Sequence, residues 1–456
     1  MKVAQTKKIT IAGAGLAGPL LSILLARKGF EVELFERNPD PRQAGASAGR
    51  SINLALAERG RHALEMAGLM EEVDQFTIPM RGRMLHAADG SLTLQKYGKD
   101  ASEVIWSTHR AELNKTMLDA AEASNKVDIF FDHKLSEVDW EAQTISYSAT
   151  NGGDLHSHPF EVLIGADGGG SAVRGCMEKV ASLGVSTEPL EHGYRELTIP
   201  PGSNGEFLMD SNALHIWPRG GFMLIALPNC DGSFTVTLFL SIHQDPGFRK
   251  LGDWAAQQQF MQQQFPDAMS LLTDLKSDFR DKPVGLLGTV RCKKWYFRDK
   301  AVLIGDAAHA IVPFHGQGMN ASFEDCTEFM ACLQEQDQDW EDVFSRFEAR
   351  RIDHANAIAD MALENYLVMR EAVRDPGFLL RKELEHELER RHPNRFIARY
   401  SLVMFHRLPY AQVYHRGQLQ AEILDQLLAE AESLQAIDFG KAARLIDRQL
   451  GTIKEA

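Results

Sequence analysis

The chain has 456 residues, of which 44% are hydrophobic and 25% charged, a composition typical of a soluble globular protein with two or three domains. Its 49 basic and 63 acidic residues give a formal net charge of −14, which argues against non-specific binding to nucleic acid. The five cysteines include no C-x-x-C pair, so we expect a reducing compartment and no zinc site. Since neither a signal peptide nor an apolar run of membrane-spanning length is recognisable, the sequence predicts a cytoplasmic protein.

Residues 8–36 carry the pattern of a nucleotide-binding unit. A predicted strand leads into Gly13, Gly15 and Gly18, which have the spacing G-x-G-x-x-G, and leucines at helical spacing follow. In such a turn the glycines permit the tight bend, the approach of a pyrophosphate and the close packing of helix on strand, and the phosphate lies at the helix N-terminus. A second predicted strand ends on Glu36, where a carboxylate is needed for ribose hydroxyls. The unit predicts a dinucleotide, and FAD and NAD(P) both stay open at this point.

Several arginines follow this unit. Arg37, Arg42 and Arg50 could bind the phosphates of a nicotinamide nucleotide, although the solvated surface is the ordinary place for any one arginine. A helix with Ser107 or Thr108 as its N-cap is expected next, and it carries Arg110 in its first turn. Arg110 is therefore a second phosphate candidate, with a surface role equally open.

The middle of the chain favours β-structure. Residues 80–97 predict two strands around the turn signal Asp89-Gly90, and these strands carry Arg83 and Tyr97. Alternating apolar residues over 190–292 predict an antiparallel sheet that forms the floor of a second domain.

Two further strand ends carry an acid beside glycines. Asp167 follows an apolar strand in the segment Gly-Ala-Asp-Gly, which by itself could be a turn. Asp306 ends another strand, and a glycine-containing loop then leads to a helix that begins near Ala321. Open α/β sheets bind ligands at such strand ends, and helix N-termini favour anions. Residues 340–456 read as mostly helical and are expected to pack on the body of the protein.

These three motifs, in this order, resemble those of the single-component class A flavoprotein aromatic hydroxylases. The resemblance covers nearly the whole chain through the blocks 49–60, 80–84, 213–218, 312–320, 361–366 and 399–403. It implies an α/β (α+β two-domain) fold. A Rossmann-like FAD-binding domain is expected over 1–75, 100–180 and 290–370, an antiparallel-sheet substrate domain over 76–99 and 181–289, and a C-terminal helical region over 371–456.

The resemblance also implies an activity, because the blocks are most similar to members that hydroxylate L-kynurenine. FAD would be the bound cofactor, NADPH a transient co-substrate, and oxygen would reach the ring carbon ortho to the amine through a flavin hydroperoxide. No catalytic side chain and no metal are expected, and a homodimer stays open. Two features depart from the pattern: the membrane-anchoring segment of animal members has no counterpart here, and Val368 stands where an acid is expected after Tyr366.

Residue by residue, the resemblance assigns a substrate site and a cofactor site. Arg83 would bind the substrate carboxylate and Tyr97 would add a hydroxyl donor. Asn365 and Tyr400 would close the site, and Phe314 and His315 would line the ring pocket, although His315 could equally stabilise its own loop. The cofactor residues would be Gly13, Gly15, Leu16, Gly18, Glu36, Arg37, Ala55, Arg110, Asp167, Asp306, Gly318, Met319 and Asn320.

Three alternatives remain at this point. The first is a class A hydroxylase of another aromatic acid, such as a salicylate-like compound. The second is a flavoenzyme of this fold that reduces or halogenates, although the lysine and the tryptophan-bearing motif typical of halogenases are not found. The third is a flavin-binding scaffold without activity.

Overall fold

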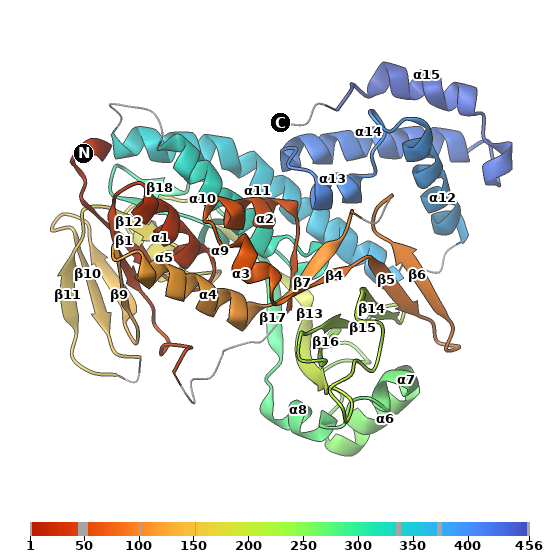
Figure 1. Cartoon of the computed structure of the whole chain (residues 1–456), viewed down its shortest axis with the longest axis horizontal. Coiled ribbons are helices and arrows are strands. Elements are labelled where there is room, and N and C mark those ends of the chain that lie inside the picture. Colours follow the sequence, from red (N-terminus) through yellow and green to blue (C-terminus); the bar gives the residue numbers. More distant parts are fainter. Residues whose placement is uncertain are drawn as a thin grey trace.

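The computed structural model describes residues 2–43, 53–99, 102–150, 152–333, 339–371 and 376–453. Arg50 and the first residues of the block 49–60 lie outside this part. The nucleotide-binding sheet and its helices form one half of the molecule, and an antiparallel sheet forms the other half, with the C-terminal helices above it (Figure 1).

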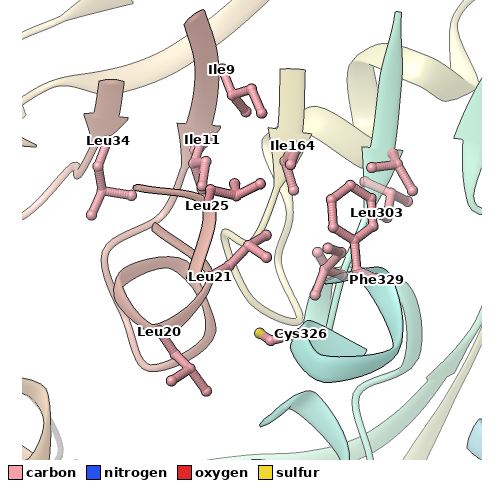
Figure 2. Packing of buried hydrophobic residues seen from close by; sticks show 14 of the residues in the cluster. Ile9, Ile11, Leu20, Leu21, Leu25, Leu34, Ile164, Leu303, Cys326 and Phe329 are labelled. Atoms are coloured by element: carbon pink, nitrogen blue, oxygen red, sulfur yellow. The ribbon is translucent and has the colours of Figure 1, made fainter. Parts of the chain in front are cut away.

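The nucleotide-binding sheet has the strand order β18-β19-β12-β1-β2-β8, parallel except for the β18-β19 pair. Its strands are β1 (Lys8–Ala12), β2 (Glu31–Phe35), β8 (Val127–Phe130), β12 (Leu163–Gly165), β18 (Tyr296–Phe297) and β19 (Ala301–Leu303). Figure 2 shows Leu34, Ile11, Ile164 and Leu303 side by side on neighbouring strands, facing side chains of α1 (Ala17–Arg27) and α10 (Gly318–Cys332). The strand-helix-strand unit predicted for residues 8–36 is confirmed.

Two small sheets flank this core. One has the order β11-β10-β9 and the other β3-β7-β4. Their strands are β9 (Lys134–Asp139), β10 (Thr144–Ser148), β11 (His156–Pro159), β3 (Asn53–Leu56), β4 (Thr77–Met80) and β7 (Ile105–His109). The predicted N-cap at Ser107 or Thr108 is wrong, because both residues are buried inside β7, where β3 and β4 pair with them from either side. The helix α4 (Arg110–Ala123) begins only after His109.

The antiparallel sheet predicted for 190–292 is present and includes the predicted hairpin. Its order is β17-β13-β16-β15-β14-β5-β6, with strands β5 (Gly82–His86), β6 (Leu92–Lys96), β13 (Ser186–Ile199), β14 (Ala213–Pro218), β15 (Met223–Pro228), β16 (Phe234–Ser241) and β17 (Gly285–Arg291). The hairpin β5-β6 joins through a parallel pair in which Arg83 lies opposite Leu214. The helices α6 (Trp254–Gln264), α7 (Pro266–Met269) and α8 (Leu275–Asp281) contribute to a core formed with this sheet. We propose the two large sheets as the centres of the two expected domains.

The remaining helices cover the molecule and connect its halves. They are α2 (Glu58–Met66), α3 (Met70–Asp74), α5 (Ala172–Glu178), α9 (Asp306–His309), α11 (Trp340–Glu371), α12 (Pro376–Arg391), α13 (Arg399–Phe405), α14 (Tyr410–Leu428) and α15 (Phe439–Gln449). The long helix α11 passes from the nucleotide-binding half toward the substrate sheet (Figure 1). In the part of the chain that the structure describes, no helix is long and apolar enough to cross a bilayer.

A buried ionic network joins these helices. Arg351 of α11 donates from Nε to Asp325 (2.7 Å) and from Nη1 to Glu324 (2.6 Å), both on α10. Arg59 of α2 donates to the other oxygen of Glu324 (2.9 Å) and to the carbonyl oxygens of Val403 and Leu408. Burial alone would raise the pKa of Asp325, but the charges of His309 and Arg351 hold that pKa below its usual range. The network therefore fixes α10 against α2, α11 and the C-terminal helices.

Arg351→Met should destabilise the protein strongly, because the substitution leaves two buried carboxylates without their shared cation. We expect a loss of about 3–5 kcal/mol in the free energy of unfolding, measured by urea denaturation of the holoprotein. Arg350→Met is the matched control, since this neighbouring arginine is exposed and lies 3.7 Å from Glu328. Its effect should stay within about 1 kcal/mol, and equal losses in both variants would contradict the role given to the network.

Candidate active site

A cavity of about 690 Å³ lies between the carboxyl ends of the nucleotide-binding strands and the inner face of the antiparallel sheet. Most of the predicted site residues line it: Gly13, Gly15, Leu16, Glu36, Arg37, Ala55, Arg83, Tyr97, Arg110, Asp167, Asp306, Phe314, His315, Gly318, Met319 and Tyr400. Gly18, Asn320 and Asn365 are not among the described lining residues. Asn320 and Asn365 instead donate hydrogen bonds to the lining residues Ala55 and Phe314. The cavity therefore brings together residues of the glycine turn, the two acidic strand ends and the blocks 49–60, 80–84, 213–218, 312–320 and 399–403, whereas the block 361–366 contributes none of its described lining.

The three glycines of the first turn differ in what a Cβ atom would meet at each position. Gly13 has φ of +103°, and a Cβ atom there would lie 2.4 Å from the carbonyl oxygen of Ala166. A Cβ at Gly18 would lie 1.9 Å from the carbonyl oxygen of Gly13, so the helix could not pack on the turn. At Gly15 a Cβ would meet no described atom within 4 Å. Only the middle glycine faces open space, as expected where a backbone approaches a pyrophosphate.

Glu36 lies at the end of β2 and supports this turn. One carboxylate oxygen accepts the Ala14 N–H (2.8 Å), and the other accepts the backbone and side-chain N–H groups of Asn38 (2.8 and 2.7 Å). Its neighbour Arg37 is exposed on the cavity lining. Arg42, the other phosphate candidate here, instead pairs with Asp40, Asp119 and Glu122. The charge of Arg42, which was a candidate for binding a nucleotide phosphate, is thus shared by three carboxylates.

The two acidic strand ends differ in what they contact. Asp167 accepts hydrogen bonds from the Ser171 hydroxyl (2.5 Å) and the Ala172 N–H (2.6 Å), so it also fixes the start of α5. Asp306 is exposed to the cavity. Burial within the protein body raises the pKa of both carboxyls, and the charges of His309 and Arg110 oppose that rise at Asp306. Asp306 is therefore the acid left facing a ligand.

The loop and helix after Asp306 form the next wall. Gly318 and Met319 line the cavity, and α10 begins at Gly318, three residues before the predicted start. Asn320 is fully buried; its amide accepts the Ala57 N–H (2.9 Å) and donates to the Ala55 carbonyl (2.8 Å). Asn320 thus positions Ala55 rather than facing the cavity.

The end of the cavity farther from the glycine turn is built around Arg83, the residue predicted to bind the substrate carboxylate. Its guanidinium carbon lies 4.6 Å from the ring centre of Tyr400 and 5.6 Å from that of Tyr97, and the two rings stack at 5.6 Å. Arg83 Nε is buried and finds no hydrogen-bond partner among the described residues. Burial raises the pKa of Tyr97, so this phenol keeps its proton. A cation that packs against two stacked aromatic rings and has a donor without a partner among the described residues is suited to a carboxylate.

The turn Pro313–His315 forms another part of the cavity wall. His315 stacks on Tyr400 at 5.4 Å, and burial lowers the pKa of its imidazole to about 3. Phe314 packs on Tyr366 at 4.6 Å, and the Asn365 amide donates to the Phe314 carbonyl (2.6 Å). Asn365 therefore holds the turn from behind.

Further lining residues were missed in the sequence. The substrate sheet contributes Tyr194, Leu214, Met223, Ile225, Thr237 and Phe239, and α11 contributes Met369. Their strand periodicity was visible, but it does not tell which face of the sheet meets the cavity. At the nucleotide end, His133 and the first two residues of β9, Lys134 and Leu135, line the cavity, where the sequence has no motif.

The residues present fit FAD. The open space at Gly15 allows a pyrophosphate near the start of α1, Asp306 and Glu36 offer carboxylates for hydroxyl groups, and the lining continues without interruption from this turn to the substrate sheet. Fold and cavity together define a flavoprotein monooxygenase of the aromatic hydroxylase type.

Comparisons with known proteins agree with this class. The family model described as "FAD binding domain" matches residues 6–197 and 219–362. Curated proteins named kynurenine 3-monooxygenase are similar over nearly their full length: that of Stenotrophomonas maltophilia (strain K279a) is 48% identical, with 99% of each chain covered, and that of Xanthomonas axonopodis pv. citri (strain 306) is 47% identical, with 99% of this chain and 98% of the relative covered. The chain belongs to the kynurenine 3-monooxygenase family of FAD-binding proteins.

Solved structures share the fold at lower identity. A 2-methyl-3-hydroxypyridine-5-carboxylic acid oxygenase superposes with a TM-score of 0.66 at 19% identity, covering 82% of this chain and 96% of that one. The protein pqsL from Pseudomonas aeruginosa, described as "a probable FAD-dependent monooxygenase", gives a TM-score of 0.63 at 18% identity, covering 82% of this chain and 100% of that one. These likenesses concern the fold alone.

Substituting Gly13 and Gly15 by alanine should separate folding from cofactor binding. Gly13→Ala forces a side chain into a positive φ and against a carbonyl, so the free energy of unfolding of the apoprotein should fall by roughly 1–2 kcal/mol or more. Gly15→Ala should leave apoprotein stability nearly unchanged and weaken FAD about tenfold, because its methyl group enters the space for the phosphates. Urea denaturation and flavin fluorescence titration measure the two effects. Unchanged FAD affinity in Gly15→Ala would contradict the assignment.

The His315 imidazole should stay neutral from pH 9 down to about pH 4, because its pKa lies at about 3. An unfolded histidine takes up a proton near pH 6.5, so this residue opposes folding increasingly as pH falls from there toward 3. ¹⁵N NMR of the histidine rings checks the neutral state, with His315→Asn used to assign the signal. A protonation midpoint of the His315 ring near pH 6.5 would contradict this prediction and show that the imidazole is more accessible to water than its burial indicates.

Proposed function

We propose that the protein hydroxylates L-kynurenine to 3-hydroxy-L-kynurenine with NADPH and O₂. The observation that carries this proposal is the position of Arg83, which lies against the stacked rings of Tyr97 and Tyr400 in the same cavity as the glycine turn. Kynurenine combines an aromatic ring with a carboxylate on a short side chain, so one cation can anchor the acid while the ring extends toward the cofactor. The names of the full-length relatives support the same substrate.

FAD, when bound, supplies the oxygen and electron chemistry. The chain's residues bind, orient and exclude water. Arg83 would hold the carboxylate, and the protonated hydroxyl of Tyr97 would donate a hydrogen bond beside it. Met223, Ile225 and Phe239 provide an apolar wall for the ring and keep water from the reacting carbon.

No side chain needs to act as a strong base, because an aniline ring is already electron-rich. His315 fits this requirement, since its low pKa keeps it neutral and leaves it as a hydrogen-bonding wall of the pocket. Asn365 would act through the Phe314 carbonyl by holding the turn in place.

On the cofactor side, we propose that the Gly15 backbone approaches the pyrophosphate, with Arg37 and Arg110 nearby. Glu36 would accept a ribose hydroxyl, and Asp306, the acid left facing the cavity, would accept the ribityl hydroxyls. Gly318 and Met319 would lie at the polar edge of the flavin. NADPH would bind transiently elsewhere. A cytoplasmic location belongs to the proposal and is supported by the five cysteines, all within the described residues, which form no disulfide with one another.

The cavity also leaves a second candidate, hydroxylation of another aromatic acid, because Arg83 recognises the carboxylate and not the ketone. NADPH oxidation stimulated by salicylate-like compounds but not by L-kynurenine would favour it.

Arg83→Met should raise the KM for L-kynurenine about 10- to 100-fold while bound FAD is retained, because a charged hydrogen bond to the carboxylate is lost and the apolar stem is kept. Stopped-flow flavin reduction by NADPH with and without L-kynurenine measures the effect. Asp306→Asn should do the reverse and weaken FAD binding first. Arg280→Met is the control, since that arginine is exposed and pairs with Asp281. Loss of flavin from Arg83→Met would overturn its assignment to the substrate.

A further inference from the structure

A chain of polar groups lies on the outer face of the substrate sheet, opposite the cavity. His86 of β5 and His215 of β14 are both buried and share a hydrogen bond between His86 Nε2 and His215 Nδ1 (2.8 Å). The other nitrogen of His86 contacts Asp267 Oδ2 of α7 (2.9 Å), and the other nitrogen of His215 contacts the Asp210 carbonyl oxygen (2.9 Å). We call these four residues the histidine relay. None of them lines the cavity described above.

The number of protons in the relay follows from its geometry. The chain of three contacts ends on an oxygen atom at each side: the Asp210 carbonyl oxygen, which can only accept, and an oxygen of the Asp267 carboxylate. Two neutral imidazoles bring two ring protons, yet three contacts need three. With Asp267 ionised, all three hydrogen bonds form only when the imidazole pair carries one extra proton, wherever along the relay that proton sits. Without it, one contact brings two acceptors together.

The surroundings decide how tightly the extra proton is held. Burial lowers the pKa of both imidazoles, that of His215 to about 4, while Asp267 opposes this at His86. The Trp217 indole donates to the same Asp267 oxygen (2.7 Å) and, together with His86, holds the pKa of this carboxyl below its usual range.

The other charged groups packed on the relay are few in the part of the chain that the structure describes. Arg219 donates to the His86 carbonyl oxygen (3.0 Å) and lowers the pKa of His86. The Asp210 carboxylate pairs with Arg81 (2.7 Å). With these groups in place, the relay takes up its proton on the acidic side of neutrality.

The relay is connected to the substrate site through strand β5. His86 points to the outer face and Arg83 to the inner one, and in the sheet β5 has β14 on one side and the edge strand β6 on the other. The register places Met84 opposite His215, so the two histidines tie β5 to β14 one pair beyond Arg83 and Leu214. What fixes β5 against β14 therefore fixes the backbone from which Arg83 reaches the cavity.

We propose that the histidine relay is a proton-dependent positioning device for Arg83, with His86 as the positioning residue. Uptake of one proton completes the three hydrogen bonds and holds β5 in its substrate-binding position; release of the proton opens one contact and loosens the carboxylate site. This inference rests on the proposed function, since it assumes that Arg83 binds the substrate carboxylate.

Asp267→Asn tests the proposal most directly. The amide that this substitution introduces can donate to His86, so two neutral imidazoles then satisfy all three contacts without an extra proton. In that orientation the Trp217 indole loses its acceptor, a cost that does not vary with pH. For the wild-type holoenzyme, the Kd of L-kynurenine, read from the flavin absorbance, should rise about threefold to tenfold between pH 4.5 and 7.5. The Asp267→Asn holoenzyme should lose this step.

His243→Asn is the control, because it changes an exposed histidine outside the relay and should retain the step. If Asp267→Asn keeps the full step and binds L-kynurenine more weakly by the same factor at every pH, the proposal is overturned, because that is the result of a purely structural role.

¹⁵N NMR of the histidine rings gives a readout that does not depend on the substrate. In the wild type, one imidazole of the relay should show both nitrogens protonated at pH 4.5 and should lose one proton by pH 7.5, whereas Asp267→Asn should show two neutral rings across this range. Two singly protonated rings in the wild type at pH 4.5 would overturn the proposal. If L-kynurenine fails to bind at any pH, the proposed function falls, while the ring protons still decide whether the relay titrates.

Discussion

Two adjacent carboxylates at the centre of α10 determine how this molecule is assembled. Asp325 is fully buried and the Glu324 side chain is 13% exposed, and their charges are compensated by Arg59 and Arg351, which reach them from α2 and α11, and by His309. Asp325 also accepts the Gly305 N–H (2.8 Å) and the His309 imidazole (2.6 Å), so the same carboxylate holds the loop that presents Asp306. The compensation of these two carboxylates thus links the loop at Asp306 to α2, α10 and α11.

This coupling explains why elements far apart in the sequence define one cavity. The cofactor loop is tied to α10 through Asp325, α10 is tied to α11 through Arg351, and α11 supports the turn Pro313–His315 through Asn365. Arg59 extends the same set of contacts to the carbonyl of Val403, close to Tyr400. The two ends of the site are therefore related by short, charged contacts and not by loops alone.

The part of this arrangement that could be predicted from sequence is the local part. The glycine turn, the acid ends of the strands and the β5-β6 hairpin each have a short pattern with a backbone reason, as Gly13 and Gly18 show. The role of Asn320 could not be read in this way, since its amide is used by Ala55 and Ala57, about 265 residues earlier, and Gly60 leaves room for it. Ser107 and Thr108 were misread because cap residues and strand residues share the same small polar types, and only the pairing partners β3 and β4 distinguish them. Long-range partners of polar groups leave no local pattern.

The charged side chains are distributed unequally between the two ends of the cavity, which are proposed to bind different ligands. Its nucleotide end contains Glu36, Asp167 and Asp306 together with Arg37, Arg110 and Lys134, whereas Arg83 is the single charged side chain among the described lining residues of the substrate sheet and C-terminal helices. An acid entering the cavity therefore finds at the substrate end a cation that no neighbouring carboxylate neutralises, and its aromatic part is left among Met223, Ile225 and Phe239. That cation stands on β5, which lies next to the edge strand β6, so under the proposed function the placement of the ring would depend on how firmly β5 is held from its outer face. The proposed roles thus divide between the two faces of β5: the inner face carries Arg83 for the substrate carboxylate, and the outer face carries the histidine relay that would position the strand.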